Sequence, residues 1–138
     1  MTIYSKKITS SLKLIMPIKL SEHEIQKSFF QFLSIDPKFK PLISRKAIIA
    51  IPNGGKRNII TAIKLKKEGV TPGVFDVFCT IAKGPYHGLW IEFKAGYNKL
   101  TDEQKLFSIY RSEDDFKCVV CYSAEEAIAE LNNYLYCS

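Results

Sequence analysis

Four stretches of the chain show the apolar spacing of a helix with one buried face. Their expected limits are residues 21–36, 58–68, 101 to about 110, and 123 to about 135. Three of them open with a capping box, in which a Ser or Thr is followed three residues later by Glu or Gln. These boxes are Ser21 with Glu24, Thr101 with Gln104, and Ser123 with Glu126. The first helix should stop near Asp36-Pro37, because proline disfavours helix in the residue before it.

Short apolar runs between these helices predict strands. Residues 47–51 form a run expected to be a short buried strand, and residues 116–122 form a second one. Two further runs, residues 74–79 and 88–93, flank a turn at Lys83-Gly84-Pro85 and predict an antiparallel hairpin. The order helix, strand, helix, hairpin, helix, strand, helix predicts an α/β fold with a small mixed β-sheet flanked by helices.

Charged residues interrupt the apolar pattern at the open end of the hairpin. If the turn is centred on Gly84, Asp76 lies directly opposite Glu92, and the two side chains share one face. Lys94 follows Glu92 by two positions and shares that face. Carboxylates held together in this way usually have a cation between them. The alternative is a buried ion pair between Lys94 and one carboxylate, which leaves the other acid unexplained.

Polar residues on two neighbouring helices are candidates to complete this charged cluster. Glu24 has a sufficient structural role in its capping box, whereas Glu22 has only the helix dipole to complement. Gln26 follows Glu22 by one helical turn. Gln104 is either a cap partner alone or also a contact of the cluster, since its helix follows Lys94 after a short loop.

The formal net charge is +6, and residues 37–67 contain no acid but many lysines and arginines. A polyanionic partner suits such a stretch, and a solvated basic face is the alternative. Within it, a glycine-rich turn and two basic residues form the run Asn53-Gly54-Gly55-Lys56-Arg57. Glycine allows close approach of a ligand to the backbone, and arginine suits phosphate. The spacing of a nucleotide-binding P-loop is missing, so the other reading is a plain turn.

Length and composition predict one folded domain. The chain has 138 residues, of which 46% are hydrophobic and 25% charged. Residues 1–20 have a weak pattern and are expected to form an N-terminal extension to a domain at residues 21–138. No apolar run approaches the roughly 18 residues that span a bilayer. Cys118 and Cys121 should face opposite sides of a strand, so they are expected to be buried thiols in a reducing compartment rather than metal ligands.

The acid at Asp76 followed by Glu92-Phe93-Lys94 resembles the PD-(D/E)xK pattern of restriction-endonuclease-like nucleases. Further motifs in the same order make the resemblance more specific. They are Glu22-x-x-x-Gln26, Ile51-Pro52-Asn53-Gly54-Gly55-Lys56-Arg57, Gly73-Val74-x-Asp76, Gly88-Leu89-Trp90-Ile91-Glu92-Phe93-Lys94 and Thr101-x-Glu103-Gln104. Over about residues 22–135 the chain thus resembles the VRR-NUC family, the virus-type replication-repair nucleases. It departs at Phe75, where a proline is usual, and at Ala50, where a histidine often stands.

The resemblance implies a divalent metal site and a phosphate-binding surface. Asp76, Glu92 and the backbone carbonyl of Phe93 would hold Mg²⁺ or Mn²⁺, with Glu22 completing the shell directly or through water. Lys94 would orient the attacking water or neutralise charge on the phosphate, and Gln104 would hold that water or a phosphate oxygen. The expected contacts to nucleic acid are Gln26, Asn53, Gly54, Gly55, Lys56 and Arg57.

The function expected from this resemblance is that of a metal-dependent, structure-specific DNA endonuclease. Its substrate would be four-way (Holliday) junctions or other branched DNA. The protein would act as a homodimer, in the cytoplasm of a bacterial or phage-infected cell. The first alternative is a non-catalytic basic nucleic-acid-binding module of the same fold. Binding alone gains nothing from acids that face a phosphate backbone, which disfavours this alternative. An RNA-directed nuclease is a third reading.

Overall fold

The computed structural model describes residues 19–52 and 58–137, and its centre is a four-stranded sheet. The strands are β1 (Ile48–Ala50), β2 (Val77–Cys79), β3 (Leu89–Phe93) and β4 (Lys117–Cys121), and they lie side by side in that order. β1, β2 and β3 are antiparallel to one another in turn, whereas β4 runs parallel to β3. The predicted small mixed sheet is confirmed.

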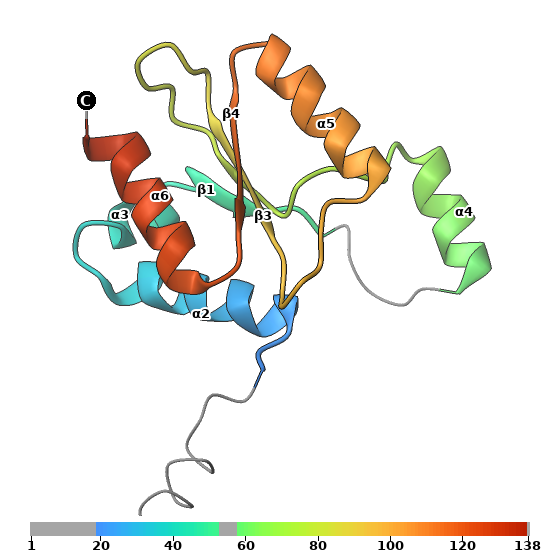
Figure 1. Ribbon diagram of the computed structural model, residues 1–138, viewed down its shortest axis with the longest axis horizontal. Coiled ribbons are helices and arrows are strands. Elements are labelled where there is room, and N and C mark those ends of the chain that lie inside the picture. The colour runs from blue at the N-terminus through green and yellow to red at the C-terminus, as the bar shows by residue number, and fades with distance from the viewer. Residues whose placement is uncertain (1–18, 53–57, 138) are drawn as a thin grey trace, which may run out of the picture.

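The helices cover both faces of this sheet (Figure 1). α2 (Glu22–Ile35), α3 (Lys40–Ser44) and α6 (Ala124–Tyr136) lie on one face, and α5 (Asp102–Glu113) lies on the other. α4 (Ile59–Lys67) stands beside the sheet, and none of its residues is buried. Among the described helices, none combines the length and the apolar content that crossing a bilayer requires.

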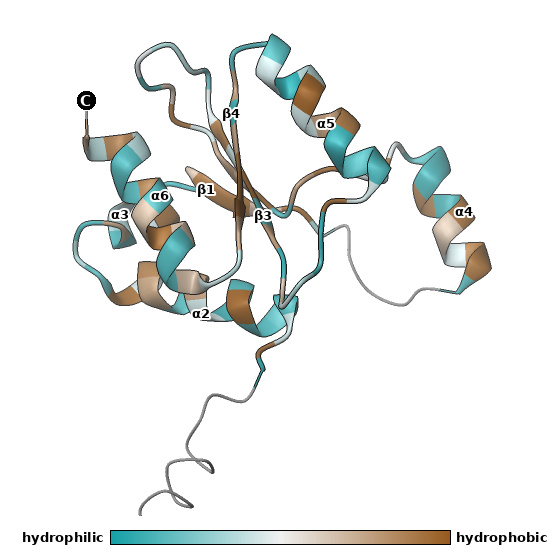
Figure 2. Cartoon of the chain, viewed as in Figure 1, coloured by the Kyte–Doolittle hydropathy of each residue, from teal (hydrophilic) through white to brown (hydrophobic). Residues whose placement is uncertain are grey.

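The main core lies between the sheet and the α2–α6 pair. Leu89, Ile91 and Phe93 alternate along β3 and are fully buried on this side. The ring of Phe93 packs against Phe29 of α2, with 5.5 Å between the ring centroids. Figure 2 shows apolar residues along the central strands and a mixture of apolar and hydrophilic residues along each helix. Burial of these apolar side chains is what holds the two layers together.

A second, aromatic cluster fills part of the opposite face, beneath α5. Phe78 stacks on Trp90 at 4.2 Å between centroids, and Trp90 meets the edge of Phe107 at 4.9 Å. Phe75 is fully buried and packs on Phe107 at 5.2 Å. The residue that replaces the family's proline therefore contributes packing between the sheet and α5.

The helix limits follow the capping signals, with one exception in detail. The capping boxes of α2 and α5 are both formed. At α6 the Ser123 hydroxyl accepts from the Glu126 N–H, but Glu126 Oε2 accepts from the Tyr122 N–H at 2.7 Å instead of from Ser123. The predicted third box is therefore wrong in its second half, because the carboxylate reaches one residue further back.

Two other elements differ from expectation. β1 is not a fully buried strand: Ile48 is buried, but Ile49 and Ala50 are exposed because β1 lies at the edge of the sheet. The short helix α3 was not predicted. It has proline in its first turn and buries only Leu42, so its five residues carry no apolar period to detect.

The two cysteines of β4 face opposite layers, as predicted. Cys118 Sγ lies 4.0 Å from the Ser108 carbonyl of α5, whereas Cys121 belongs to the core on the α2–α6 side. Burial raises the pKa of Cys118 to about 11 and that of Cys121 to about 12. Both are therefore protonated thiols at neutral pH.

Candidate active site

The register of the hairpin brings the predicted acids together. Val77 lies opposite Ile91, and the same register extended by one residue places Asp76 opposite Glu92. The Phe93 backbone N–H donates to Asp76 Oδ2 at 2.9 Å, which ties the half-buried Asp76 to the end of β3. The strand register is centred on Gly84, whereas the isolated antiparallel bridge between Lys83 and Tyr86 is centred half a residue later.

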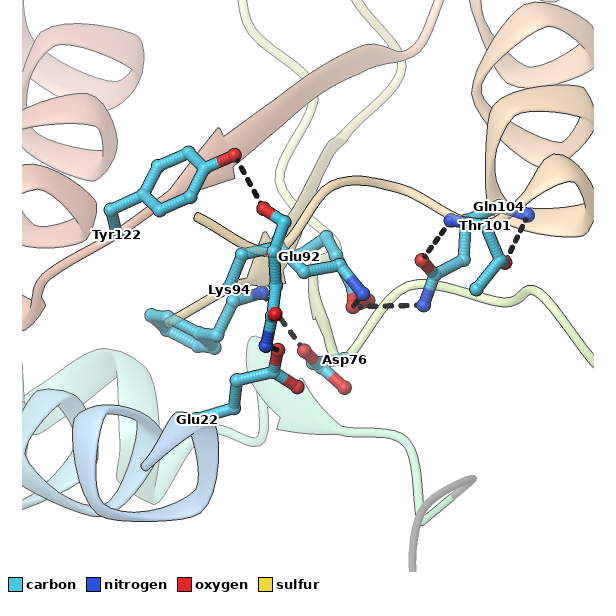
Figure 3. Close-up of polar contacts among 9 residues, drawn as sticks. Glu22, Asp76, Glu92, Lys94, Thr101, Gln104 and Tyr122 are labelled. Atoms are coloured by element: carbon cyan, nitrogen blue, oxygen red, sulfur yellow. Dashed lines mark hydrogen bonds and ion pairs between the residues drawn. The ribbon is translucent and has the colours of Figure 1, made fainter. Parts of the chain in front are cut away.

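Glu92 and Lys94 are charged residues buried within the protein, at 2% and 6% exposure. Lys94 Nζ lies 3.7 Å from Glu92 Oε2. The same oxygen accepts a hydrogen bond from Gln104 Nε2 at 3.0 Å (Figure 3). The other oxygen, Glu92 Oε1, is buried and has no hydrogen-bond partner within the described residues. One carboxylate oxygen is thus held by two groups while its twin has a free acceptor position.

Gln104 plays both of the roles that its position in the sequence allowed. Its Oε1 accepts from the Thr101 N–H at 3.0 Å and completes the capping box of α5. Its Nε2 donates to Glu92. The cap therefore fixes the amide in the orientation that presents a donor to the carboxylate, and it brings the N-terminal end of α5 to the charged cluster (Figure 3).

Glu22 rather than Glu24 faces the cluster. Glu24 accepts from the Ser21 N–H at 2.9 Å and is exposed. Glu22 is half-buried and its charge acts on both Asp76 and Glu92. Figure 3 shows its side chain directed from the start of α2 toward Asp76.

Two residues that the sequence did not indicate hold Glu22 in place. Asn98 Nδ2 donates to Glu22 Oε1 at 3.2 Å, and the Asn98 carbonyl accepts from the Tyr122 hydroxyl at 2.9 Å. Asn98 lies in a loop and Tyr122 just beyond a strand, so neither belongs to a motif. Only the three-dimensional structure, which brings them together with Glu22, identifies them as residues that position this side chain.

The electrostatics of the cluster disfavour ionisation of both central acids at the same time. Burial raises the pKa of Glu92 to about 8, and the charge of Asp76 adds to the rise while Lys94 opposes it. Burial also raises the pKa of Asp76, against the Phe93 N–H, which lowers it. Two carboxylates this close cannot both ionise easily unless a further cation joins them.

The predicted contacts to nucleic acid are only partly within the described residues. Gln26 is half-buried, one turn beyond Glu22 on α2. Asn53, Gly54, Gly55, Lys56 and Arg57 lie outside the described residues. The chain that leads to them passes the site, since the Ile51 N–H donates to the Asp76 carbonyl at 2.8 Å.

The donor atoms of the cluster suit a hard divalent cation. Carboxylate oxygens are the ligands that Mg²⁺ and Mn²⁺ prefer, and the unpartnered Glu92 Oε1 is available as one of them. In residues 19–52 and 58–137 no three His, Cys, Asp or Glu side chains converge closely enough to form a metal cage by themselves. Mg²⁺ usually keeps several waters and takes one or two protein carboxylates, so Asp76 and Glu92 fit this manner of binding.

The comparison with solved structures relates this arrangement to a known domain. A structure named VRR_NUC domain protein superposes with a TM-score of 0.73 and 28% sequence identity, and the match covers 88% of this chain and 93% of that chain. The chain resembles a VRR-NUC domain. No protein-family model and no curated protein matches it.

The match confirms the resemblance and the restriction-endonuclease-like fold. The VRR-NUC likeness suggests a nuclease-family domain, and a fold of this kind suggests the use of a divalent metal. The roles of individual residues remain predictions at this point. The geometry brings Glu22, Asp76, Glu92, Lys94 and Gln104 into one cluster at the end of β3.

Proposed function

We propose that the protein is a metal-dependent endonuclease that cleaves structured DNA. The observation that carries the proposal is the buried Glu92–Lys94 pair with Asp76 opposite, at the open end of the hairpin. The likeness to a VRR-NUC domain supports the reaction class.

A structural ion pair alone is a poor explanation of this cluster. Burying a lysine and a glutamate costs several kcal/mol per charge. A protein with apolar residues of similar size in their place is often equally stable or more stable. The pair with Lys94 occupies only one oxygen of Glu92 and leaves Oε1 unpartnered within the described residues. Asp76, which Lys94 does not neutralise directly, adds repulsion. A function that needs negative oxygens close together accounts for all three features.

In the proposed site Asp76, Glu92 and the Phe93 carbonyl hold Mg²⁺ or Mn²⁺, and Glu22 joins directly or through water. When bound, the metal polarises the scissile phosphate and lowers the pKa of a bound water. Gln104 fixes Glu92, and the Phe93 N–H fixes Asp76, so neither carboxylate has to reorganise during the reaction. Lys94 supplies a positive charge beside the phosphate from a buried, preorganised position.

DNA is the proposed substrate, with branched molecules such as four-way junctions preferred. A net charge of +6 favours a polyanion, and contacts to phosphate position a substrate with little regard to its sequence. Gln26, Asn53, Gly54, Gly55, Lys56 and Arg57 are the proposed backbone contacts.

A homodimer is part of the same proposal. Ile59, Ile60 and Ile63 of α4 are 78%, 80% and 51% exposed, and grouped exposed apolar side chains of this kind often mark an interface. We expect Ile60→Glu to shift a dimer toward monomer in analytical ultracentrifugation. An unchanged mass would remove α4 from the interface, and a monomeric wild type would remove the dimer from the proposal.

The proposed function is tested by incubating the purified full chain with duplex, flap, splayed-arm and four-way DNA of related sequence. Each reaction is run with Mg²⁺, with Mn²⁺ and with chelator. We expect cleavage with metal only, and a loss of about a thousand-fold or more in Glu92→Gln and in Lys94→Ala. Asp102→Asn, on the exposed first turn of α5, is the matched acid control and should cut as wild type does.

Three outcomes would overturn the proposal: no cleavage of any DNA by wild type, cleavage that persists in chelator, or variants as active as wild type. If wild type binds the same DNA tightly without cutting it, the non-catalytic binding module gains support. A matching set of RNA substrates shows whether RNA is cut in preference to DNA.

A further inference from the structure

Tyr97 is 97% exposed, the highest exposure among the large apolar and aromatic side chains that lie on the surface of the described residues. It lies at the tip of a turn over residues 95–98, in which the Asn98 N–H donates to the Ala95 carbonyl at 3.1 Å. Gly96 precedes it with φ of +58°, a conformation that favours glycine. Water therefore surrounds an aromatic ring that the turn directs away from the protein.

The turn itself is anchored on three sides. Asn98 is bonded to Glu22 at 3.2 Å and to the Tyr122 hydroxyl at 2.9 Å. Lys19 lies against Gly96, where an added Cβ would come within 2.9 Å of Lys19 Nζ. Ala95, at the start of the turn, is buried. The exposure of Tyr97 is thus the product of a fixed loop, and a fixed loop presents its tip residue in one place.

This tip stands beside the proposed reaction centre. Tyr97 follows Lys94 by three residues, and its neighbour Asn98 is hydrogen-bonded to Glu22. Figure 1 shows the start of α2 next to the loop that follows β3. Two exposed lysines lie near this tip: Lys19 is against Gly96, and Lys99 follows Tyr97 by two residues.

An exposed aromatic ring with lysines nearby is an arrangement that binds single-stranded nucleic acid. The ring stacks on a base, and the lysines attract the neighbouring phosphates. Within a continuous duplex both faces of each base are already covered by stacking, so the ring can be satisfied only by an unpaired base or by a base at a break in the stack.

We propose that Tyr97 stacks on an unpaired base beside the cleaved phosphate and so gives the enzyme a preference for DNA with unpaired nucleotides at the cut. This inference rests on the proposed nuclease function and deepens it by naming the feature of the substrate that is recognised. Tyr97 is a specificity residue here and takes no part in the chemical step.

The test compares two DNA substrates of the same sequence around the cut, one fully paired and one with a short unpaired run next to it. In Tyr97→Ala we expect kcat/KM for the unpaired substrate to fall about 10-fold or more, while kcat/KM for the paired substrate changes little. Tyr97→Phe keeps the ring and should keep the preference. Tyr110→Ala, which removes a 54%-exposed tyrosine from α5, is the matched control and should behave as wild type.

A binding readout separates this inference from the proposed function. 2-Aminopurine is placed in the unpaired run, and its fluorescence is followed in chelator, where no cleavage is expected. Wild type and Tyr97→Phe should quench the fluorescence by stacking, whereas Tyr97→Ala should not. Quenching by a wild type that never cuts DNA would support the stacking role and overturn only the nuclease.

Two results would overturn the stacking role while the nuclease stands. In the first, Tyr97→Ala retains both the preference and the quenching. In the second, Tyr97→Phe loses as much as Tyr97→Ala, which would assign the effect to the hydroxyl group rather than to the ring.

Discussion

Both faces of β3 are covered by helices, but one face belongs to the main core and the other carries residues of the candidate site. Leu89, Ile91 and Phe93 point to the α2–α6 layer and join the main core. Trp90 and Glu92 point to the α5 side, and Lys94 follows them just beyond the strand. Because side chains alternate along a strand, five consecutive residues contribute to the core on one side and to the site on the other. Core residues and residues of the candidate site thus alternate along one strand.

The α5 side itself changes character along the strand. At Trp90 it is aromatic, with Phe78 and Phe107 as neighbours. Two residues later, at Glu92, it is charged, and the capped N-terminal end of α5 supplies Gln104 to that carboxylate. The charged part is buried as well, with Glu92 only 2% exposed, and burial strengthens the electrostatic interactions there.

The largest effect on stability should come from the core face. We expect Ile91→Ala to lower the free energy of unfolding by about 2 to 5 kcal/mol, because it leaves a cavity in the main core. Glu92→Gln, one residue away, should lower it less, because a pKa of about 8 already leaves Glu92 largely protonated at neutral pH and the charge of Asp76 still acts on Lys94. Urea denaturation in chelator measures both. Equal losses in the two variants would mean that the charged face is as important to folding as the core.

The next effect is the dependence of stability on pH in metal-free protein. The pKa of Glu92 is raised from 4.5 to about 8, so the folded state holds a proton that the unfolded chain releases. Stability should therefore be greatest below about pH 4.5 with respect to this group and fall, by a few kcal/mol at most, as pH rises toward 8. Thermal unfolding at a series of pH values measures it.

Glu92→Gln and bound metal are the two controls for this pH dependence. Both should flatten the decline relative to metal-free wild type, the first by removing the titrating group and the second by favouring its ionised form. A decline of the same slope in Glu92→Gln would assign it to other groups.

A smaller effect separates the two roles of Gln104. Gln104→Glu keeps an acceptor for the capping box but replaces the donor to Glu92 with a second carboxylate. We expect cleavage to fall about 10- to 100-fold, as for the loss of other groups that orient a metal ligand. Thr101→Ala breaks the cap, costing about 1 kcal/mol of stability with much less effect on cleavage. If Thr101→Ala impairs cleavage as severely, the cap alone explains both residues.

The smallest effect distinguishes the two acids at the start of α2. Glu22→Gln should lower Mn²⁺ affinity about 10-fold, since Asn98 holds Glu22 at the cluster and its charge acts on Asp76 and Glu92. Glu24→Gln should change nothing, because Gln also completes a capping box. Titration with Mn²⁺ followed by calorimetry makes the comparison. Equal affinities in the two variants would leave Glu22 with structural roles only, namely complementing the dipole of α2 and accepting the hydrogen bond from Asn98.

Much of the fold could be predicted because its signals are local. A capping box acts over four residues, and those of α2 and α5 are formed as predicted. A turn centred on Gly84, together with the two-residue period of the strands, predicted that Asp76 and Glu92 would face each other. The third box is the instructive failure: Glu126 satisfies the Tyr122 N–H rather than that of Ser123. The capping-box pattern covers only residues 123–126, so it does not include the Tyr122 N–H that competes for this carboxylate.

What the sequence by itself determined is therefore the alternation that placed acids and lysine on one face of a hairpin, and the motif order that resembles VRR-NUC. The contact of Gln104 with Glu92, the link from Glu22 through Asn98 to Tyr122, and the outward position of Tyr97 came only with the tertiary structure. These contacts join segments that are from 12 to 76 positions apart. Local hydrogen bonds and residue spacing cannot specify contacts between segments so far apart along the chain. The packing of α2 and α5 against the sheet brings these segments together.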